Sequence, residues 1–162
     1  MKYDIPWGGW AIAEKDWDFI KDIIQKKKIK AVLEFGTGLS TLLISEIAGV
    51  DTFETNSEWA EKIEAKALNG NIKFYIWNGQ DPPEIERRYD LAFVDGPVGK
   101  FTGGVGREMS MRLASEYADK IIVHDAGRED EKRLQEMILN GKFRFISRSD
   151  EHQIRCNYWE KR

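Results

Sequence analysis

The chain contains few of the residues that mark secreted or membrane proteins. Only one of its 162 residues is a cysteine, and the lone Cys156 has no partner for an internal disulfide. No apolar run approaches the roughly 20 residues that cross a bilayer, and the first residues, MKYDIPW, lack the apolar core of a secretory signal. We therefore expect a cytoplasmic protein without a membrane partner.

A large excess of charge is absent as well. The 25 lysines and arginines nearly balance the 28 aspartates and glutamates, which gives a net charge of -3. Proteins that bind nucleic acid usually carry a basic patch or stripe, so we expect no nucleic-acid partner. The length suits one domain over residues 1–162, in which residues 1–28 form an N-terminal cap segment and helix. Nothing in the sequence predicts an oligomeric state.

Strand-like and helix-like segments alternate along the chain. This alternation predicts the α/β class, with a parallel sheet that helices cover on both faces. The expected strands are residues 30–35, 51–54, 72–77, 89–95 and 120–124. The expected helices are residues 16–28, 40–48, 57–68, 107–117 and 129–139. The last two segments, 143–148 and 153–159, flank a polar turn and predict a closing antiparallel hairpin.

A third glycine is missing from the most informative segment, residues 31–41. An apolar strand ends near Glu34, a turn with Gly36 and Gly38 follows, and Thr41 stands where the dinucleotide signature G-x-G-x-x-G has its last glycine. A strand that enters a glycine turn and leaves as a helix brings backbone N–H groups against a nucleotide-like ligand. Pyrophosphate needs the missing glycine and is repelled by Glu34, whereas that carboxylate can pair with an ammonium group. The segment therefore predicts S-adenosylmethionine as the ligand.

Polar residues follow the apolar part of five successive strands. Ligands of open α/β sheets gather outside the carboxyl ends of the strands, so these residues are the natural candidates for a site. Glu54, 20 positions after Glu34, can accept hydrogen bonds from a ribose diol, and polar groups after residue 77 can contact an adenine edge. The predicted cofactor-binding residues are Glu34, Gly36, Thr37, Gly38, Ser40, Thr41, Glu54, Asn78, Gly79 and Asp95.

The chain resembles the class I S-adenosylmethionine-dependent methyltransferases over nearly its whole length. Residues 34–38, EFGTG, look like the first motif of the class, with Ser40 in place of the frequent third glycine. Residues 93–97 (FVDGP), 106–109 (GREM) and 123–125 (VHD) are similar to small O-methyltransferases that act on polysaccharide uronic acids, and to the metal-dependent catechol and caffeoyl types. The resemblance implies a Rossmann-like sheet of seven strands, parallel with an antiparallel C-terminal hairpin strand, and helices on both faces.

The resemblance also implies a reaction centre at Asp95, His124 and Asp125. It makes the strands 89–95 and 120–124 neighbours, which brings the two carboxylates to a common point above the sheet. Two carboxylates and an imidazole can hold Mg²⁺ or Mn²⁺, and such a metal lowers the pKa of an acceptor hydroxyl. In the alternative without a metal, Asp95 or His124 is the general base. The metal-dependent types have Asp-Asn where this chain has His124-Asp125.

Cationic and aromatic residues around this centre are candidates for binding the acceptor. Lys100, Arg107 and Arg128 can bind a carboxylate or a phosphate on the substrate. Trp7 and Trp10, separated by two glycines, either form a lid over the cofactor or the acceptor, or cover an edge of the sheet. We predict an acceptor that is a small molecule or is saccharide-like.

Two functions are compatible with the sequence. The first is S-adenosylmethionine-dependent O-methylation of a hydroxyl on that acceptor. The second is nucleotide binding by a Rossmann-like domain, either an NAD-type oxidoreductase or a non-catalytic binding module. Structural roles also stay open for single residues, since Glu34 can pin the glycine loop, Asp95 can stabilise a turn and His124 can be a hydrogen-bonded core residue.

Overall fold

The chain folds around a seven-stranded sheet in the order β3-β2-β1-β4-β5-β7-β6. The computed structural model describes residues 3–97, 106–150, 152 and 155–162. The strands are β1 (Ala31–Phe35), β2 (Gly49–Glu54), β3 (Ile72–Ile76), β4 (Leu91–Val94), β5 (Lys120–His124), β6 (Phe143–Arg148) and β7 (Cys156–Lys161). The first five pair in parallel, whereas β7 runs antiparallel to both β5 and β6. The predicted mostly parallel sheet with an antiparallel C-terminal hairpin is thereby confirmed.

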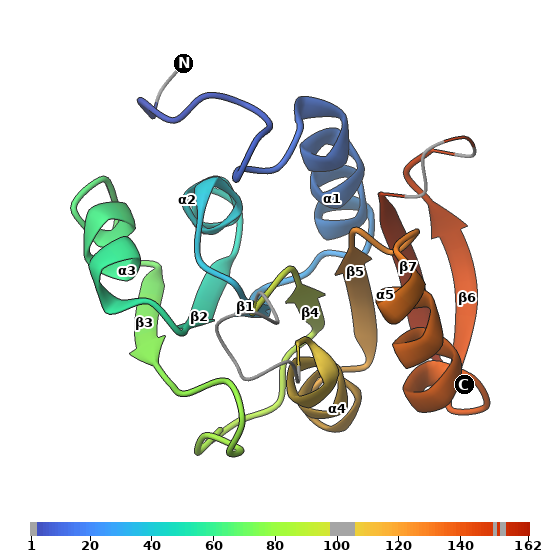
Figure 1. Cartoon of the computed structure of the whole chain (residues 1–162). Helices are drawn as coiled ribbons and strands as arrows, with labels where there is room; N and C mark the ends of the chain where they lie inside the picture. Colours follow the sequence, from blue (N-terminus) through green and yellow to red (C-terminus); the bar gives the residue numbers. More distant parts are fainter. Residues whose placement is uncertain (1–2, 98–105, 151, 153–154) are drawn as a thin grey trace.

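Helices cover both faces of this sheet (Figure 1). On one side lie α1 (Glu14–Lys26), α2 (Leu39–Ser45) and α3 (Ser57–Glu64), and on the other lie α4 (Glu108–Tyr117) and α5 (Glu129–Leu134). The chain after α5 continues as a π-helix, η2 (Gln135–Leu139), so the helix predicted over residues 129–139 has two parts. Among the helices of the described residues, none combines the length and the apolar character that a bilayer crossing requires.

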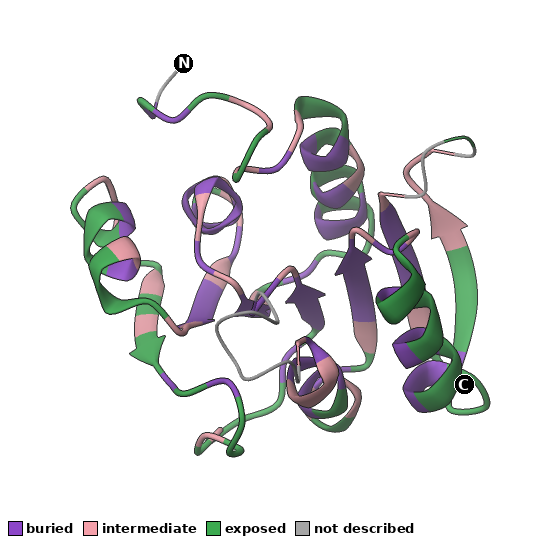
Figure 2. Ribbon diagram, in the orientation of Figure 1, coloured by how far each residue is buried: buried purple, intermediate pink, exposed green. Residues whose placement is uncertain are grey.

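Alternate residues of the central strands point to opposite faces and build two cores. Figure 2 shows β4 and most of β5 as buried, and residues 91–94 and 121–123 in these strands are all apolar. The core on the α1 side contains Ile20, Ile24, Val32, Phe93 and Ile122. The core on the α4 side contains Leu33, Val94, Met111, Ala114 and Val123. This alternation therefore also determines which face of the sheet the residues directly after β4 and β5 point to.

The N-terminal segment packs over the helices on the α1 side. Tyr3 and Ile5 are buried against Leu39 and Leu42 of α2 and against Ile63 of α3. Apolar contacts of this kind supply most of the attraction between such a segment and the body of the protein. The segment before α1 thus joins the packed part of the chain.

The turn after β1 touches the turn after β4 through backbone atoms. Gly36 has φ +98°, and a Cβ built there would lie 2.8 Å from the backbone nitrogen of Gly96. Gly38 in the same turn has φ -176°, an extended conformation that any residue adopts, and open space surrounds its missing Cβ. Two glycines of one turn therefore have different structural requirements.

We expect Gly36→Ala to destabilise the protein and Gly38→Ala to leave its stability nearly unchanged. Gly36→Ala places an alanine in a left-handed conformation and creates a clash with the backbone of Gly96. Together these effects lower the free energy of unfolding by about 3 kcal/mol. Urea denaturation of both variants checks the difference. Equal losses of stability in the two variants would contradict the close approach of the two turns.

Candidate functional site

The glycine turn is held from below by the buried carboxylate of Glu34. Ser40 Oγ donates to Glu34 Oε1 at 2.6 Å. Thr41 Oγ1 accepts a hydrogen bond from the Gly38 N–H and donates to Glu34 Oε2. Glu34, Ser40 and Thr41 are all fully or almost fully buried. These three predicted cofactor-binding residues therefore shape the turn from inside, and the geometry favours the loop-pinning alternative for Glu34 over a direct contact with an ammonium group.

Glu54, at the end of β2, clamps the same turn from the side. Its Oε2 accepts the Thr37 N–H at 3.0 Å, and its Oε1 accepts the N–H groups of Thr55 and Asn56 at 2.8 and 2.9 Å. The Trp59 Nε1–H donates to the Thr37 carbonyl at 2.7 Å. Glu54 thus caps the segment that follows it and also lies beside the glycine turn.

The predicted adenine-contacting residues lie in a turn after β3. Asn78 is exposed, and its Oδ1 accepts the N–H groups of Gln80 and Asp81 at 2.9 Å. Its Nδ2 donates to Asp81 Oδ2 at 2.6 Å, and Gly79 has φ +76°. The Asn78 side chain therefore stabilises its own turn.

The structure joins Asp95, after β4, to His124, at the end of β5. His124 Nδ1 lies 2.8 Å from Asp95 Oδ1, and His124 Nε2 lies 3.2 Å from Oδ2 of Asp16, in the first turn of α1. Arg155 Nε donates to the same Asp16 oxygen at 2.8 Å. His124 is thus a bridge between two carboxylates that are 79 residues apart in the chain (95 − 16).

Asp16 is a member of this network that sequence reasoning missed. A signal was present, because Asp16 precedes Ile20 by four residues and so shares the buried face of the predicted helix. A buried carboxylate requires a partner. That partner, His124, lies 108 residues away and cannot be identified from the pattern around Asp16.

Arg107 occupies the point where Asp95 and Asp125 meet. Its Nη1 donates to the His124 carbonyl at 2.7 Å, and its Nη2 lies 3.2 Å from Asp95 Oδ1 and 3.4 Å from Asp125 Oδ2. Arg107 is 5% exposed, and Glu131 lies near its other side at 3.6 Å. Arg107 therefore organises the centre from within. The expectation that Arg107 binds an anionic group of the substrate does not fit this buried position.

The charges of this network reinforce one another. Burial of the His124 ring opposes its protonation, but the carboxylates of Asp95, Asp125 and Asp16 outweigh burial and hold the pKa of His124 well above 6.5. Burial raises the pKa of Asp125, and His124, Arg107 and Arg128 more than reverse this, so the pKa of Asp125 lies far below its ordinary value. At neutral pH His124 is therefore a cation that donates from both ring nitrogens.

The remaining predicted substrate residues lie in different surroundings. The Arg128 side chain is 64% exposed, and its Nη2 lies 2.9 Å from Asp125 Oδ2. Trp10 is 79% exposed, whereas Trp7 is half-buried and packs against the cores on the α1 side. Lys100 lies outside the described residues. Arg128 is consequently the predicted cation that is both described and accessible to an acceptor.

The buried carboxyl group of Glu34 makes the stability of the protein depend on pH. Its complete burial raises the pKa of Glu34 from 4.5 to about 7, against the opposing hydrogen bonds from Ser40 and Thr41. The folded protein therefore keeps this proton over a pH range in which the unfolded chain loses it. The resulting stabilisation is fully present below pH 4.5 and is lost as the pH rises through 7.

We expect wild-type protein to lose about 3 kcal/mol of stability relative to Glu34→Gln between pH 4.5 and 8, since the pKa difference (7 − 4.5) is converted at 1.36 kcal/mol per pH unit. Urea denaturation across this pH range measures the effect. The matched control is Glu58→Gln, which changes an exposed carboxylate. A pH-independent difference between wild type and Glu34→Gln would contradict a protonated Glu34 in the folded protein.

Comparison with known proteins identifies the fold. No protein-family model matches the chain, and no curated protein matches it. Among solved structures, an O-methyltransferase from Bacillus cereus in complex with SAH has a TM-score of 0.70 and 16% identity, over 94% of this chain and 82% of that one. The tRNA (m1A58) methyltransferase TrmI from Aquifex aeolicus has a TM-score of 0.69 and 18% identity, over 98% of this chain and 72% of that one.

A TehB-like SAM-dependent methyltransferase from Corynebacterium glutamicum is similar to the same degree. Its TM-score is 0.68 at 12% identity, over 94% of this chain and 90% of that one. The likeness thus extends over almost the whole chain. The chain has the Rossmann-like fold of the S-adenosylmethionine-dependent methyltransferases.

Proposed function

We propose that this protein is an S-adenosylmethionine-dependent methyltransferase that methylates a hydroxyl of a small-molecule or saccharide-like acceptor. The observation that carries the proposal is the adjacency of two sets of residues at the ends of neighbouring strands. Glu54 ends β2, the turn with Gly38 follows β1, and Asp95 follows β4 on the other side of β1. A methyl donor on the first set lies within reach of an acceptor at the second.

The glycine turn and Glu54 fit the nucleoside part of such a donor. An added Cβ at Gly38 meets no atom within 4 Å, so open space lies beside the backbone of the turn. Glu54 Oε2 accepts one hydrogen bond from Thr37, and a carboxylate oxygen can accept two, so a ribose hydroxyl can also donate to it. Bound S-adenosylmethionine supplies a methyl group that its sulfonium has already activated. Asn78 and Gly79 are our candidates for the adenine contact.

The sheet order and Thr41 argue against the NAD-type alternative. Dinucleotide-binding domains have the order 3-2-1-4-5-6, whereas this sheet has an antiparallel strand, β7, between β5 and β6. Thr41 is buried, and its hydroxyl bonds to Glu34 where a dinucleotide signature has glycine. Both features favour a donor without pyrophosphate.

We propose that Asp95 binds the hydroxyl group of the acceptor. Methyl transfer requires an acceptor oxygen in line with the methyl group, and the hydroxyl must lose its proton. The Asp95 side chain is 21% exposed, and hydrogen bonds from His124 and Arg107 fix its orientation. Asp95 orients the hydroxyl by accepting its hydrogen bond and takes up the proton. His124 is protonated and has both ring nitrogens engaged, so it positions Asp95 and is not the base.

The residues around Asp95 do not fit the predicted Mg²⁺ or Mn²⁺ site. Asp95, His124 and Asp125 bring one ligand atom each to within 4.8 Å of the others. The Arg107 guanidinium, however, already contacts both carboxylates from a position buried in the protein. An ion at this point displaces a cation that also holds the His124 carbonyl. We therefore propose that methyl transfer at Asp95 proceeds without a metal ion.

RNA is the second candidate acceptor. The solved tRNA methyltransferase from Aquifex aeolicus has the same fold as this chain, which makes RNA a specific alternative. The net charge of -3 gives little attraction to a phosphate backbone, and for this reason we favour a small acceptor. Incubation with labelled S-adenosylmethionine and either RNA or a panel of uronic acids, catechols and small metabolites separates the two. Label on RNA alone, or on amines but never on hydroxyls, contradicts our proposal.

We expect S-adenosylhomocysteine to bind the wild-type protein and Glu54→Gln to weaken this binding about 10- to 100-fold, since the variant loses a hydrogen bond to a charged group. Isothermal titration calorimetry measures both affinities. Glu58→Gln, on the exposed face of α3, is the matched control and should bind as wild type does. Binding of NAD in place of S-adenosylhomocysteine would reject the methyltransferase assignment.

Arg128 gives a test of acceptor charge. If the acceptor is a uronic acid, we expect Arg128→Gln to raise its KM about 10-fold with little change in kcat, because an exposed cation is removed from the binding step. The KM of a neutral saccharide acceptor should stay unchanged. Arg133→Gln, which removes an exposed arginine of α5, is the control. Equal effects of Arg128→Gln on charged and neutral acceptors would exclude a carboxylate contact.

A further inference from the structure

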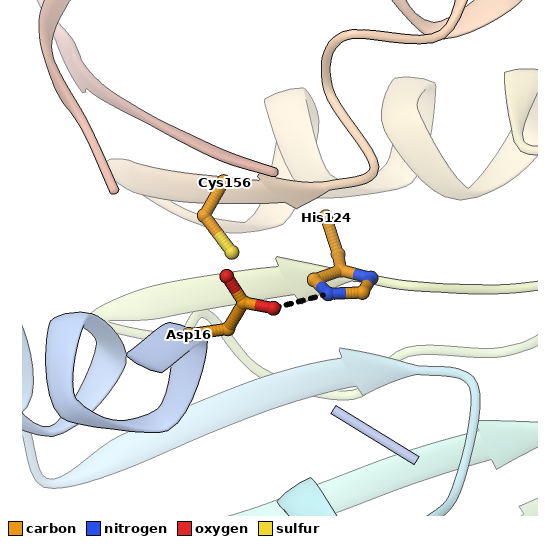
Figure 3. A group of neighbouring side chains, drawn as sticks. All are labelled: Asp16, His124 and Cys156. Carbon is orange, nitrogen blue, oxygen red and sulfur yellow. Dashed lines mark hydrogen bonds and ion pairs between the residues drawn. The ribbon is translucent and has the colours of Figure 1, made fainter. Parts of the chain in front are cut away.

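Asp16, His124 and Cys156 form a cluster on the Nε2 side of the His124 ring, away from the Asp95 contact (Figure 3). Their potential ligand atoms all lie within 4.8 Å of one another. The three residues are 1%, 4% and 0% exposed. Figure 3 shows the three side chains converging from three separate segments of the chain.

The fold places these side chains together through pairing and packing. His124 and Cys156 are direct partners in the antiparallel pair β5–β7, so their side chains leave the sheet on the same face. This is the face that α1 covers, and Asp16 lies in the first turn of α1. The cluster is therefore fixed by elements from the beginning, the middle and the end of the chain.

We propose that Asp16, His124 and Cys156 bind a divalent metal ion of the Zn²⁺ type. A thiolate, an imidazole and a carboxylate are the donors that Zn²⁺ selects, whereas Mg²⁺ and Ca²⁺ take oxygen ligands. Three protein ligands leave a fourth tetrahedral position for water. This proposal is independent of the proposed methyltransferase activity, because the ion would bind behind His124 and not at Asp95.

The spacing of the donors suits this ion. Two ligands at Zn–N and Zn–O distances of about 2.0–2.1 Å in tetrahedral geometry lie about 3.3 Å apart. His124 Nε2 and Asp16 Oδ2 already lie 3.2 Å apart. A thiolate in the same geometry lies about 3.5 Å from each of them, and Cys156 Sγ lies within 4.8 Å of both atoms.

The surroundings of the ligands also fit a metal site. Histidines that bind metals almost always donate the other ring N–H to a carboxylate or carbonyl, and His124 Nδ1 lies 2.8 Å from Asp95 Oδ1. Ligating carboxylates are themselves hydrogen-bonded, and Arg155 Nε donates at 2.8 Å to Asp16 Oδ2, the oxygen that also contacts His124. Once His124 Nε2 gives up its proton, the second lone pair of this oxygen is free for the ion, so Arg155 can stay in place. The ion replaces the proton on His124 Nε2 and the proton on Cys156 Sγ, so two protons leave as two charges enter. The net charge of the cluster does not change.

Co²⁺ is the probe, because it enters Zn²⁺ sites and its bond to a thiolate absorbs in the near ultraviolet. Cys156 is the one cysteine of the sequence, so a thiolate band can arise only from this residue. We expect one equivalent of Co²⁺ to give this band together with the visible absorption of tetrahedral Co²⁺, and Zn²⁺ to abolish both by displacement. Wild-type protein that binds no Co²⁺, or binds it without the thiolate band, overturns the proposal.

Variants locate the site independently of absorption. We expect Cys156→Ala and Asp16→Asn each to lower Zn²⁺ affinity at least about 10-fold, measured by competition with a chromogenic chelator. The matched control is His152→Gln, which removes the other histidine of the chain and should keep wild-type affinity. Undiminished affinity in Cys156→Ala contradicts the site. The Co²⁺ spectrum of wild-type protein decides the question where a variant fails to fold.

Discussion

The bridge from Asp95 through His124 to Asp16 is the interaction on which the centre of the molecule depends. It joins the ends of β4 and β5 to α1, and Arg107 and Arg155 complete its charge balance. Buried charges are tolerated only when every member has a partner, and removal of one partner leaves the other uncompensated. The helix before β1 and the reaction centre are therefore parts of one electrostatic unit.

Two buried acids, Asp16 and Glu34, are accommodated in opposite ways. Asp16 has cationic partners, and they lower its pKa despite burial. Glu34 has hydroxyl partners, Ser40 and Thr41, and burial then dominates and raises its pKa to about 7. A neutral Glu34 can hold the turn without placing a negative charge behind it. The turn is thus compatible with more than one charge on a bound ligand.

The helices, the strands and the strand ends could be predicted from local sequence, because hydrophobic periodicity and turn-forming residues act over a few residues. The family resemblance correctly made β4 and β5 neighbours, so Asp95 and Asp125 do converge. The position of Arg107 between these two carboxylates was not predicted, since the depth of Arg107 depends on how α4 packs against β5. Contacts such as His124 with Asp16 are set by tertiary packing, which no short segment encodes.

The proposed metal site and the proposed reaction centre share one imidazole, and this links them physically. Without an ion, His124 is a cation that donates to Asp95 and Asp16. With an ion on Nε2, the ring gives up one proton and keeps the Nδ1–H that orients Asp95. The Nδ1–H would still be available to Asp95, and the positive charge would lie on the ion instead of the ring. The two proposals thus share a residue but not a ligand position, because the ion would use Nε2 and the contact with Asp95 uses Nδ1.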